Sequence, residues 1–139
     1  MSIRAEAVIL STDWEWRHSL ARTLGSYGID CVHAANLQDC LEIVARESVG
    51  LIFWDSHLVD ASYQEIAESM VAIDPRLRIV VVSHMDDRDW RLGGARKTAF
   101  AVIPFPCQPT DIEWALSRAI RAELLDGRSV QARELQTQL

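Results

Sequence analysis

The segment Leu51-Ile52-Phe53-Trp54-Asp55 is a short apolar run that ends at a carboxylate. Gly50 precedes the run and polar residues follow it, which is typical of a strand buried on both faces of a parallel sheet. In open α/β sheets, ligands bind beyond the carboxyl ends of the strands, near the point where the strand order reverses. We therefore predict that Asp55 lies at such a site, provided that the rest of the chain builds the sheet.

The composition is that of one soluble globular domain. The chain has 139 residues, of which 49% are hydrophobic and 24% are charged, enough to bury a core and too apolar for a disordered chain. A net charge of -6 disfavours a nucleic-acid-binding face. No segment is long enough to span a bilayer. The three cysteines are scattered and form no CxxC pair, so we expect reduced thiols in the cytoplasm.

Apolar residues alternate between strand-like runs and helical spacing five times along the chain. The predicted strands are Ala5–Ser11, Ile29–His33, Leu51–Asp55, Arg78–Ser83 and Phe100–Ile103. A helix is predicted after each strand. The first two begin at the predicted caps Asp13 and Asn36, and the third begins near Ala61–Ser62. A short polar helix is predicted from Asp87 to Arg91, and the last helix opens at Thr110-Asp111 after a turn over Pro104–Pro109. Such alternation predicts a parallel sheet with helices on both faces. We expect a flavodoxin-like three-layer α/β sandwich with five helices, over residues 1–126. Residues 127–139 would extend the last helix or form a flexible tail.

Polar residues gather where the predicted strands end. In the strand order 2-1-3-4-5, the first and third strands flank the point where the order reverses, so Asp13 and Asp55 would share a crevice. The other residues expected at this edge are Ser11, Thr12, His57, Ser83, His84, Phe105 and Pro106.

With this pattern the chain resembles the receiver domain of bacterial two-component response regulators, a CheY-like family, over roughly Ala5 to Leu125. Asp55 matches the aspartate that accepts the phosphoryl group, and Ser83 matches the hydroxyl residue that ends the fourth strand. Pro106 matches the proline of the Lys-Pro dipeptide that ends the fifth strand. The resemblance implies a module of phosphorelay signal transduction.

Two departures from the family pattern affect the phosphorylation site. Ser11 and Thr12 stand where the family has an acidic pair, or Thr12 and Asp13 do if the match is shifted by one residue. Either way, at most one carboxylate remains. Phe105 stands at the position of the lysine, so the resemblance implies a site that has lost its cation.

These losses predict a pseudo-receiver. Mg²⁺ prefers several oxygen ligands that include carboxylates, so Asp13 and Asp55 would bind it only weakly. Loss of one electrostatic contact to a transition state typically costs about 3–4 kcal/mol. We predict slow or absent phosphorylation of Asp55, with no enzymatic activity. The expected partners are a histidine kinase, another signalling protein, or a second copy that binds through the fourth helix, fifth strand and fifth helix. Trp114, expected to be exposed on the last helix, is a partner-binding candidate.

A second interpretation stays open from the residues alone. His57, His84, Asp55 and Asp86 combine imidazole and carboxylate groups, which suit transition metals. The chain would then be a small-ligand or metal-binding domain on the same scaffold.

Overall fold

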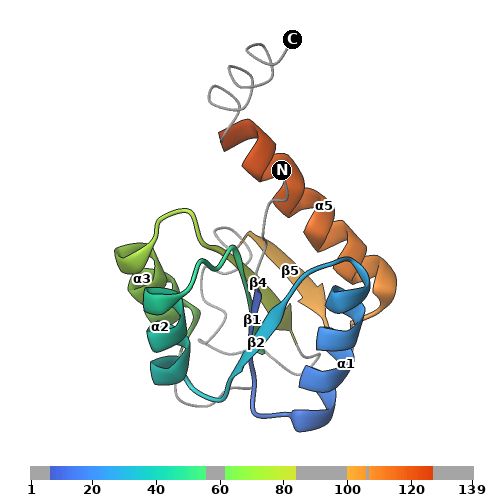
Figure 1. The fold of residues 1–139 in the computed structure, drawn as a ribbon, viewed down its shortest axis with the longest axis horizontal. Coiled ribbons are helices and arrows are strands. Elements are labelled where there is room, and N and C mark those ends of the chain that lie inside the picture. The colour runs from blue at the N-terminus through green and yellow to red at the C-terminus, as the bar shows by residue number, and fades with distance from the viewer. Residues whose placement is uncertain (1–6, 56–61, 84–99, 106, 127–139) are drawn as a thin grey trace.

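The computed structural model describes residues 7–55, 62–83, 100–105 and 107–126. Their elements are β1 (Ala7–Leu10), α1 (Trp14–Ser26), β2 (Cys31–Ala34), α2 (Leu37–Arg46), β3 (Leu51–Asp55), α3 (Tyr63–Ile73), β4 (Arg78–Ser83), β5 (Ala101–Pro104) and α5 (Pro109–Asp126). The strands form one parallel sheet in the order β2-β1-β3-β4-β5. Helices α2 and α3 cover one face, and α1 and α5 cover the other (Figure 1). The predicted three-layer fold is confirmed. The predicted helix at 87–91 and the tail at 127–139 lie outside the described residues.

Some predicted boundaries were wrong. Strand β2 begins two residues later than predicted, and β5 is shifted by one residue toward the C-terminus. Pro104, which we expected in a turn, ends β5. It is tolerated there because β5 lies at the edge of the described sheet. Pro109 is the first residue of α5, a position where the missing backbone N–H removes no helical hydrogen bond.

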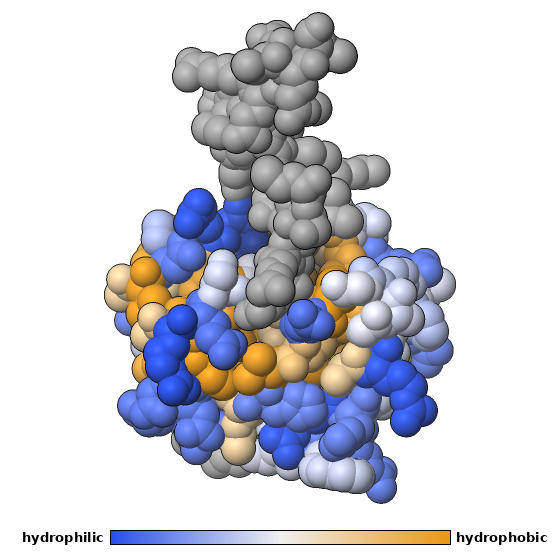
Figure 2. Space-filling model, viewed as in Figure 1, coloured by the Kyte–Doolittle hydropathy of each residue, from blue (hydrophilic) through white to orange (hydrophobic). Residues whose placement is uncertain are grey.

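The core consists of two apolar layers, one on each face of the sheet. Side chains alternate along β3, so that Trp54 packs toward α2 and α3 while Phe53 packs toward α1 and α5. All five residues of β3 are buried, which explains why the strand reads as a continuous apolar run. Burial of each large side chain contributes about 1.5–3 kcal/mol. In Figure 2, hydrophilic residues cover most of the outside, and apolar residues come into view mainly in the middle of the molecule.

Two helices begin at the caps that the sequence predicts, Asp13 and Asn36, and a third begins after Ser62, near its predicted start. Asp13 accepts a hydrogen bond from the backbone N–H of Trp16 at 3.0 Å. Asn36 and Ser62 make equivalent bonds of 2.8 and 3.2 Å at the starts of α2 and α3. Each cap satisfies a backbone donor that the helix leaves open and contributes about 1 kcal/mol. The cap at Asp13 fixes the start of α1 beside the carboxyl edge of the sheet.

Helix α5 is the longest described helix and extends past the sheet (Figure 1). Its 18 residues span about 27 Å, whereas the strands of four to six residues span about 13–20 Å. Tyr27 at the end of α1 donates a hydrogen bond to Glu113 of α5 at 2.6 Å. None of the helices in the described ranges is long and apolar enough to cross a membrane.

Candidate functional site

Asp55 lies buried at the carboxyl end of β3, with only 5% of its surface exposed. Parallel pairing sets Leu10 of β1 beside Trp54, so the next residue of the chain, Ser11, reaches Asp55. The Ser11 Oγ donates a hydrogen bond to Asp55 Oδ2 at 2.8 Å, and the Ser11 side chain is fully buried. The structure thus joins the phosphoacceptor position directly to a hydroxyl from the neighbouring strand.

The residues after Ser11 turn away from this buried pair. Thr12 and Asp13 are exposed, and the Asp13 carboxylate caps α1 through Trp16. The backbone N–H of Asp13 donates to Ser11 Oγ at 3.0 Å. Ser11 therefore accepts one hydrogen bond and donates another, which fixes the direction of its hydroxyl toward Asp55.

Phe105 occupies the position where the resemblance places a lysine. Its backbone N–H donates to the carbonyl of Ser83 at 2.9 Å, just beyond β4 and β5. Its ring lies 5.9 Å from the ring of Trp16, centroid to centroid, with the planes tilted by 57°. Tilted aromatic pairs at this separation attract each other. Both residues belong to the apolar layer beneath α1 and α5, so packing rather than charge occupies this position.

Cys107 is a site residue that the sequence analysis missed. Burial, together with the charges of Asp111 and Asp55 and against the opposing effect of a hydrogen bond from the Trp16 indole, raises the pKa of its half-buried thiol to about 12. The thiol therefore lies near Asp55 and stays protonated at neutral pH. Its place just after the fifth strand was the signal that could have revealed it.

Ser83 lies at the same carboxyl edge of the sheet as Asp55. It belongs to β4, which pairs with β3 on the side opposite β1. Asp55 pairs with Val82, so Ser83 lies one residue further along β4, and its side chain is half-buried. The remaining residues predicted for this edge, Pro106, His57, His84 and Asp86, lie outside the described residues.

Asp13 and Asp55, the two carboxylates predicted to bind Mg²⁺, each already accept a hydrogen bond. The described residues include no group of three or more His, Cys, Asp or Glu side chains placed to hold a metal. Asp55 Oδ2 is engaged by Ser11, and Asp13 Oδ1 is engaged by the helix cap. Mg²⁺ requires near-octahedral oxygen coordination.

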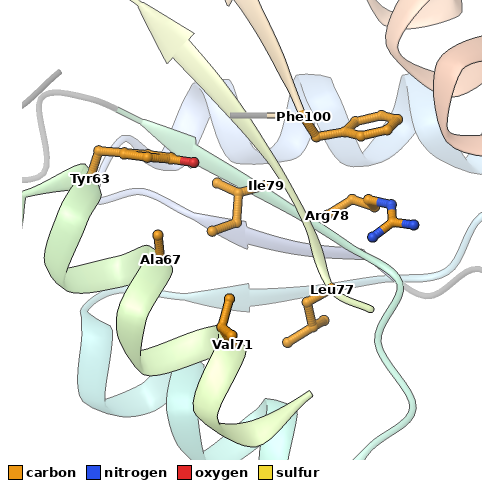
Figure 3. Close-up of a pocket in the computed structure, with 7 residues that line it drawn as sticks. All are labelled: Tyr63, Ala67, Val71, Leu77, Arg78, Ile79 and Phe100. Atoms are coloured by element: carbon orange, nitrogen blue, oxygen red, sulfur yellow. The ribbon is translucent and has the colours of Figure 1, made fainter. Parts of the chain in front are cut away.

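A hollow of about 330 Å³ lies between α3 and β4 (Figure 3). It is lined by Tyr63, Ala67, Val71, Leu77, Arg78, Ile79 and Phe100. Arg78 is the first residue of β4, whereas Asp55 pairs near the end of that strand. Much of the lining thus comes from the opposite edge of the sheet, and no residue of the Asp55 site contributes to it.

Comparisons with known proteins identify the fold. No protein-family model matches the chain, and no curated protein sequence matches it. A response regulator receiver domain from Clostridium thermocellum aligns with a TM-score of 0.76 at 18% identity, over 87% of this chain and 98% of its own. This chain has the receiver-domain fold. A CheY-like receiver domain from Methanospirillum hungatei aligns with a TM-score of 0.78 at 19% identity, over 90% of this chain and 100% of its own. The receiver domain of an HD domain-containing protein from Pseudomonas fluorescens reaches 0.80 at 14% identity, over 92% and 95%.

Proposed function

We propose that this chain is a two-component signalling module with a receiver fold that acts through protein contacts. In this proposal Asp55 accepts a phosphoryl group slowly or not at all. The receiver fold supports the signalling role, and the place of Asp55 at the end of β3 supports its descent from a phosphoacceptor. The chain is then a pseudo-receiver and not an enzyme.

The observation that carries the proposal is the aromatic pair of Phe105 and Trp16 at the lysine position. Phosphoryl transfer depends on positive charge that neutralises the oxygens of the transferring group. A phenyl ring supplies no such charge. Loss of one contact of about 3–4 kcal/mol lowers a rate by two to three orders of magnitude.

The hydrogen bond between Ser11 and Asp55 supports the same conclusion. The bond engages one oxygen of the carboxylate that would have to attack phosphorus. Ser11 also occupies a position where the family pattern has an acidic residue, which leaves fewer ligands for a metal ion. Attack on phosphorus through this oxygen would require Asp55 to give up the bond from Ser11.

The proposed partners are a histidine kinase or another signalling protein. The proposal also includes a homodimer, which would form through the predicted fourth helix, β5 and α5. We propose no nucleic-acid or membrane partner, because the net charge is -6. We assign the module to the cytoplasm, since Cys31, Cys40 and Cys107 are free thiols.

The test uses beryllofluoride, a mimic of the phosphoryl group, with Mg²⁺. Tryptophan fluorescence and sedimentation are measured as the mimic is added to the wild-type chain and to the Asp55→Asn variant. We expect no saturable change in either chain. A saturable change in the wild type that Asp55→Asn abolishes would restore an active phosphorylation switch.

A further inference from the structure

Arg118 on α5 is held between two aromatic rings. Its guanidinium carbon lies 5.3 Å from the centroid of the Phe100 ring and 5.3 Å from that of the Trp114 ring. Its Nε donates a hydrogen bond to the carbonyl of Phe100 at 3.2 Å. A cation within about 6 Å of an aromatic face is attracted by the ring. The two rings and the hydrogen bond together orient an arginine that lies at the surface.

No acid among the residues whose side chains the structure describes accounts for this orientation. On a helix, residues three and four positions apart are neighbours, and the neighbours of Arg118 at these spacings are Trp114, Ala115, Arg121 and Ala122. In the part of the chain that the structure describes, no acidic side chain forms an ion pair with Arg118. The positive charge is therefore positioned but not neutralised by the described residues.

The two acids that precede Arg118 on α5 are engaged elsewhere. Glu113 accepts a hydrogen bond from Tyr27 at the end of α1. Asp111 accepts one from the backbone N–H of Gln108 at 2.9 Å, at the start of α5. Neither contact involves Arg118, so neither of these two acids neutralises its charge.

The arginine and its rings lie at the amino-terminal edge of the sheet. Arg78 begins β4 and places a second guanidinium 5.8 Å from the Phe100 ring. Figure 3 shows the Phe100 ring beside Arg78, between the hollow and α5. Arg78 lies four residues before Val82, the partner of Asp55, so about 13 Å of β4 separates this edge from the Asp55 edge. A ligand here would not touch the phosphoacceptor position.

We propose that Arg118, Trp114 and Phe100 form a docking point for an acidic segment of a partner protein. A carboxylate of that segment pairs with the Arg118 guanidinium, and an apolar side chain next to it packs on the Trp114 ring. The inference rests on the proposed function, because it names the partner chemistry of a module that works through protein contacts.

Two features favour a protein segment over a small anion. The Trp114 side chain is 49% exposed although it is large and apolar, and it adjoins the oriented guanidinium. Arginine forms paired hydrogen bonds with carboxylates, and tryptophan and arginine dominate the energetic centres of protein interfaces. A small anion would use the arginine but would leave the exposed indole without a role.

The test is binding of short synthetic peptides to the full chain. One peptide array varies each position among Asp, Glu, Ser, Leu and Phe, and a matched array carries Asn and Gln in place of the acids. We expect acidic peptides with an apolar residue to bind and to shift the NMR signal of the Arg118 Nε–H. Arg118→Gln should weaken this binding about tenfold to a hundredfold. Arg118→Lys, which keeps the charge but loses the planar fork, should lose less.

Arg46→Gln is the matched control. Arg46 is also exposed and also donates from Nε to a backbone carbonyl, that of Glu42, but it lies on α2. Arg46→Gln should leave peptide binding within about twofold of the wild type. Failure of the proposed function would appear as saturable beryllofluoride binding to the wild type, whereas failure of this inference would appear in the peptide binding alone.

Four outcomes would overturn the inference. No acidic peptide binds, the neutral array binds equally well, or Arg118→Gln binds as tightly as the wild type. The fourth is that inorganic phosphate binds the wild type by itself and, at the same concentrations, displaces the acidic peptide completely. Sedimentation decides the remaining alternative, because a dimer that Arg118→Gln dissociates would make a second copy the occupant. Urea unfolding of every variant confirms that each one folds.

Discussion

The hydrogen bond between Ser11 and Asp55 gives a prediction with a calculable size. Ser11 is fully buried, Asp55 is 5% exposed, and their oxygens lie 2.8 Å apart. A hydrogen bond to a charged group contributes about 1.5–3 kcal/mol. Ser11→Ala also removes the acceptor for the backbone N–H of Asp13, which is worth about 0.5–1.5 kcal/mol. We expect Ser11→Ala to lower the free energy of unfolding by about 2–4 kcal/mol.

The assay is urea unfolding at neutral pH, followed by tryptophan fluorescence. In a parallel thermal unfolding experiment, Tm should fall by about 2–4 °C for each kcal/mol lost from the free energy of unfolding. The variants are Ser11→Ala, Asp55→Ala and the double variant, because a double-mutant cycle isolates the energy of the pair. We expect the coupling energy to be about 1.5–3 kcal/mol.

Ser26→Ala is the matched control for this cycle. The Ser26 hydroxyl donates to the carbonyl of Thr23 at 2.6 Å, a short bond like that of Ser11 but at the surface. Its removal should cost less than about 0.5 kcal/mol. A loss below about 0.5 kcal/mol for Ser11→Ala, or a coupling energy near zero, would refute the inference that this bond holds Asp55 in place.

Three further predictions concern the pocket and the core. Phe105→Lys combined with Ser11→Asp should make Asp55 react with acetyl phosphate and Mg²⁺, seen by intact mass, and an inert double variant would show that these positions do not limit the reaction. The pKa of the Cys40 thiol is raised by burial from 9.0 to about 12, so alkylation by iodoacetamide at pH 8 should be slow in the native chain and fast in urea. Because the thiol pKa is raised in the folded chain, its contribution to the free energy of unfolding is complete below pH 9 and is lost as pH rises from 9 toward 12. Cys40→Ala should flatten this decline in the free energy of unfolding. Trp54→Ala should cost about 3–5 kcal/mol in urea unfolding, because Trp54 is fully buried.

The sequence predicts the central strands well because their burial leaves a strong signal. β3 is covered by helices on both faces, and only an apolar run satisfies that environment. β2 is harder to delimit because it lies at the sheet edge, where three of its four residues are only half-buried. Partial burial weakens the contrast between strand and loop. The boundaries of β2 therefore could not be read from its residues.

The candidate site could be predicted in position but not in its contacts. The place of Asp55 follows from where its strand ends. The bond from Ser11 depends on the register of β1 against β3, which no local pattern encodes. Trp114 is exposed, as its spacing on the last helix predicts. The contact of Arg118 with Phe100 depends on how α5 crosses the start of β5, and the sequence analysis missed it.

We expect Asp55 to accept phosphoryl groups poorly, because Phe105 stands at the lysine position and packs against Trp16. The most direct measurement is the intact mass of the wild-type chain after incubation with acetyl phosphate and Mg²⁺. The Asp55→Asn variant serves as the blank. We predict that the mass of the wild type stays unchanged, like that of the blank. Stoichiometric addition of one phosphoryl group to the wild type, absent from Asp55→Asn, would contradict the claim.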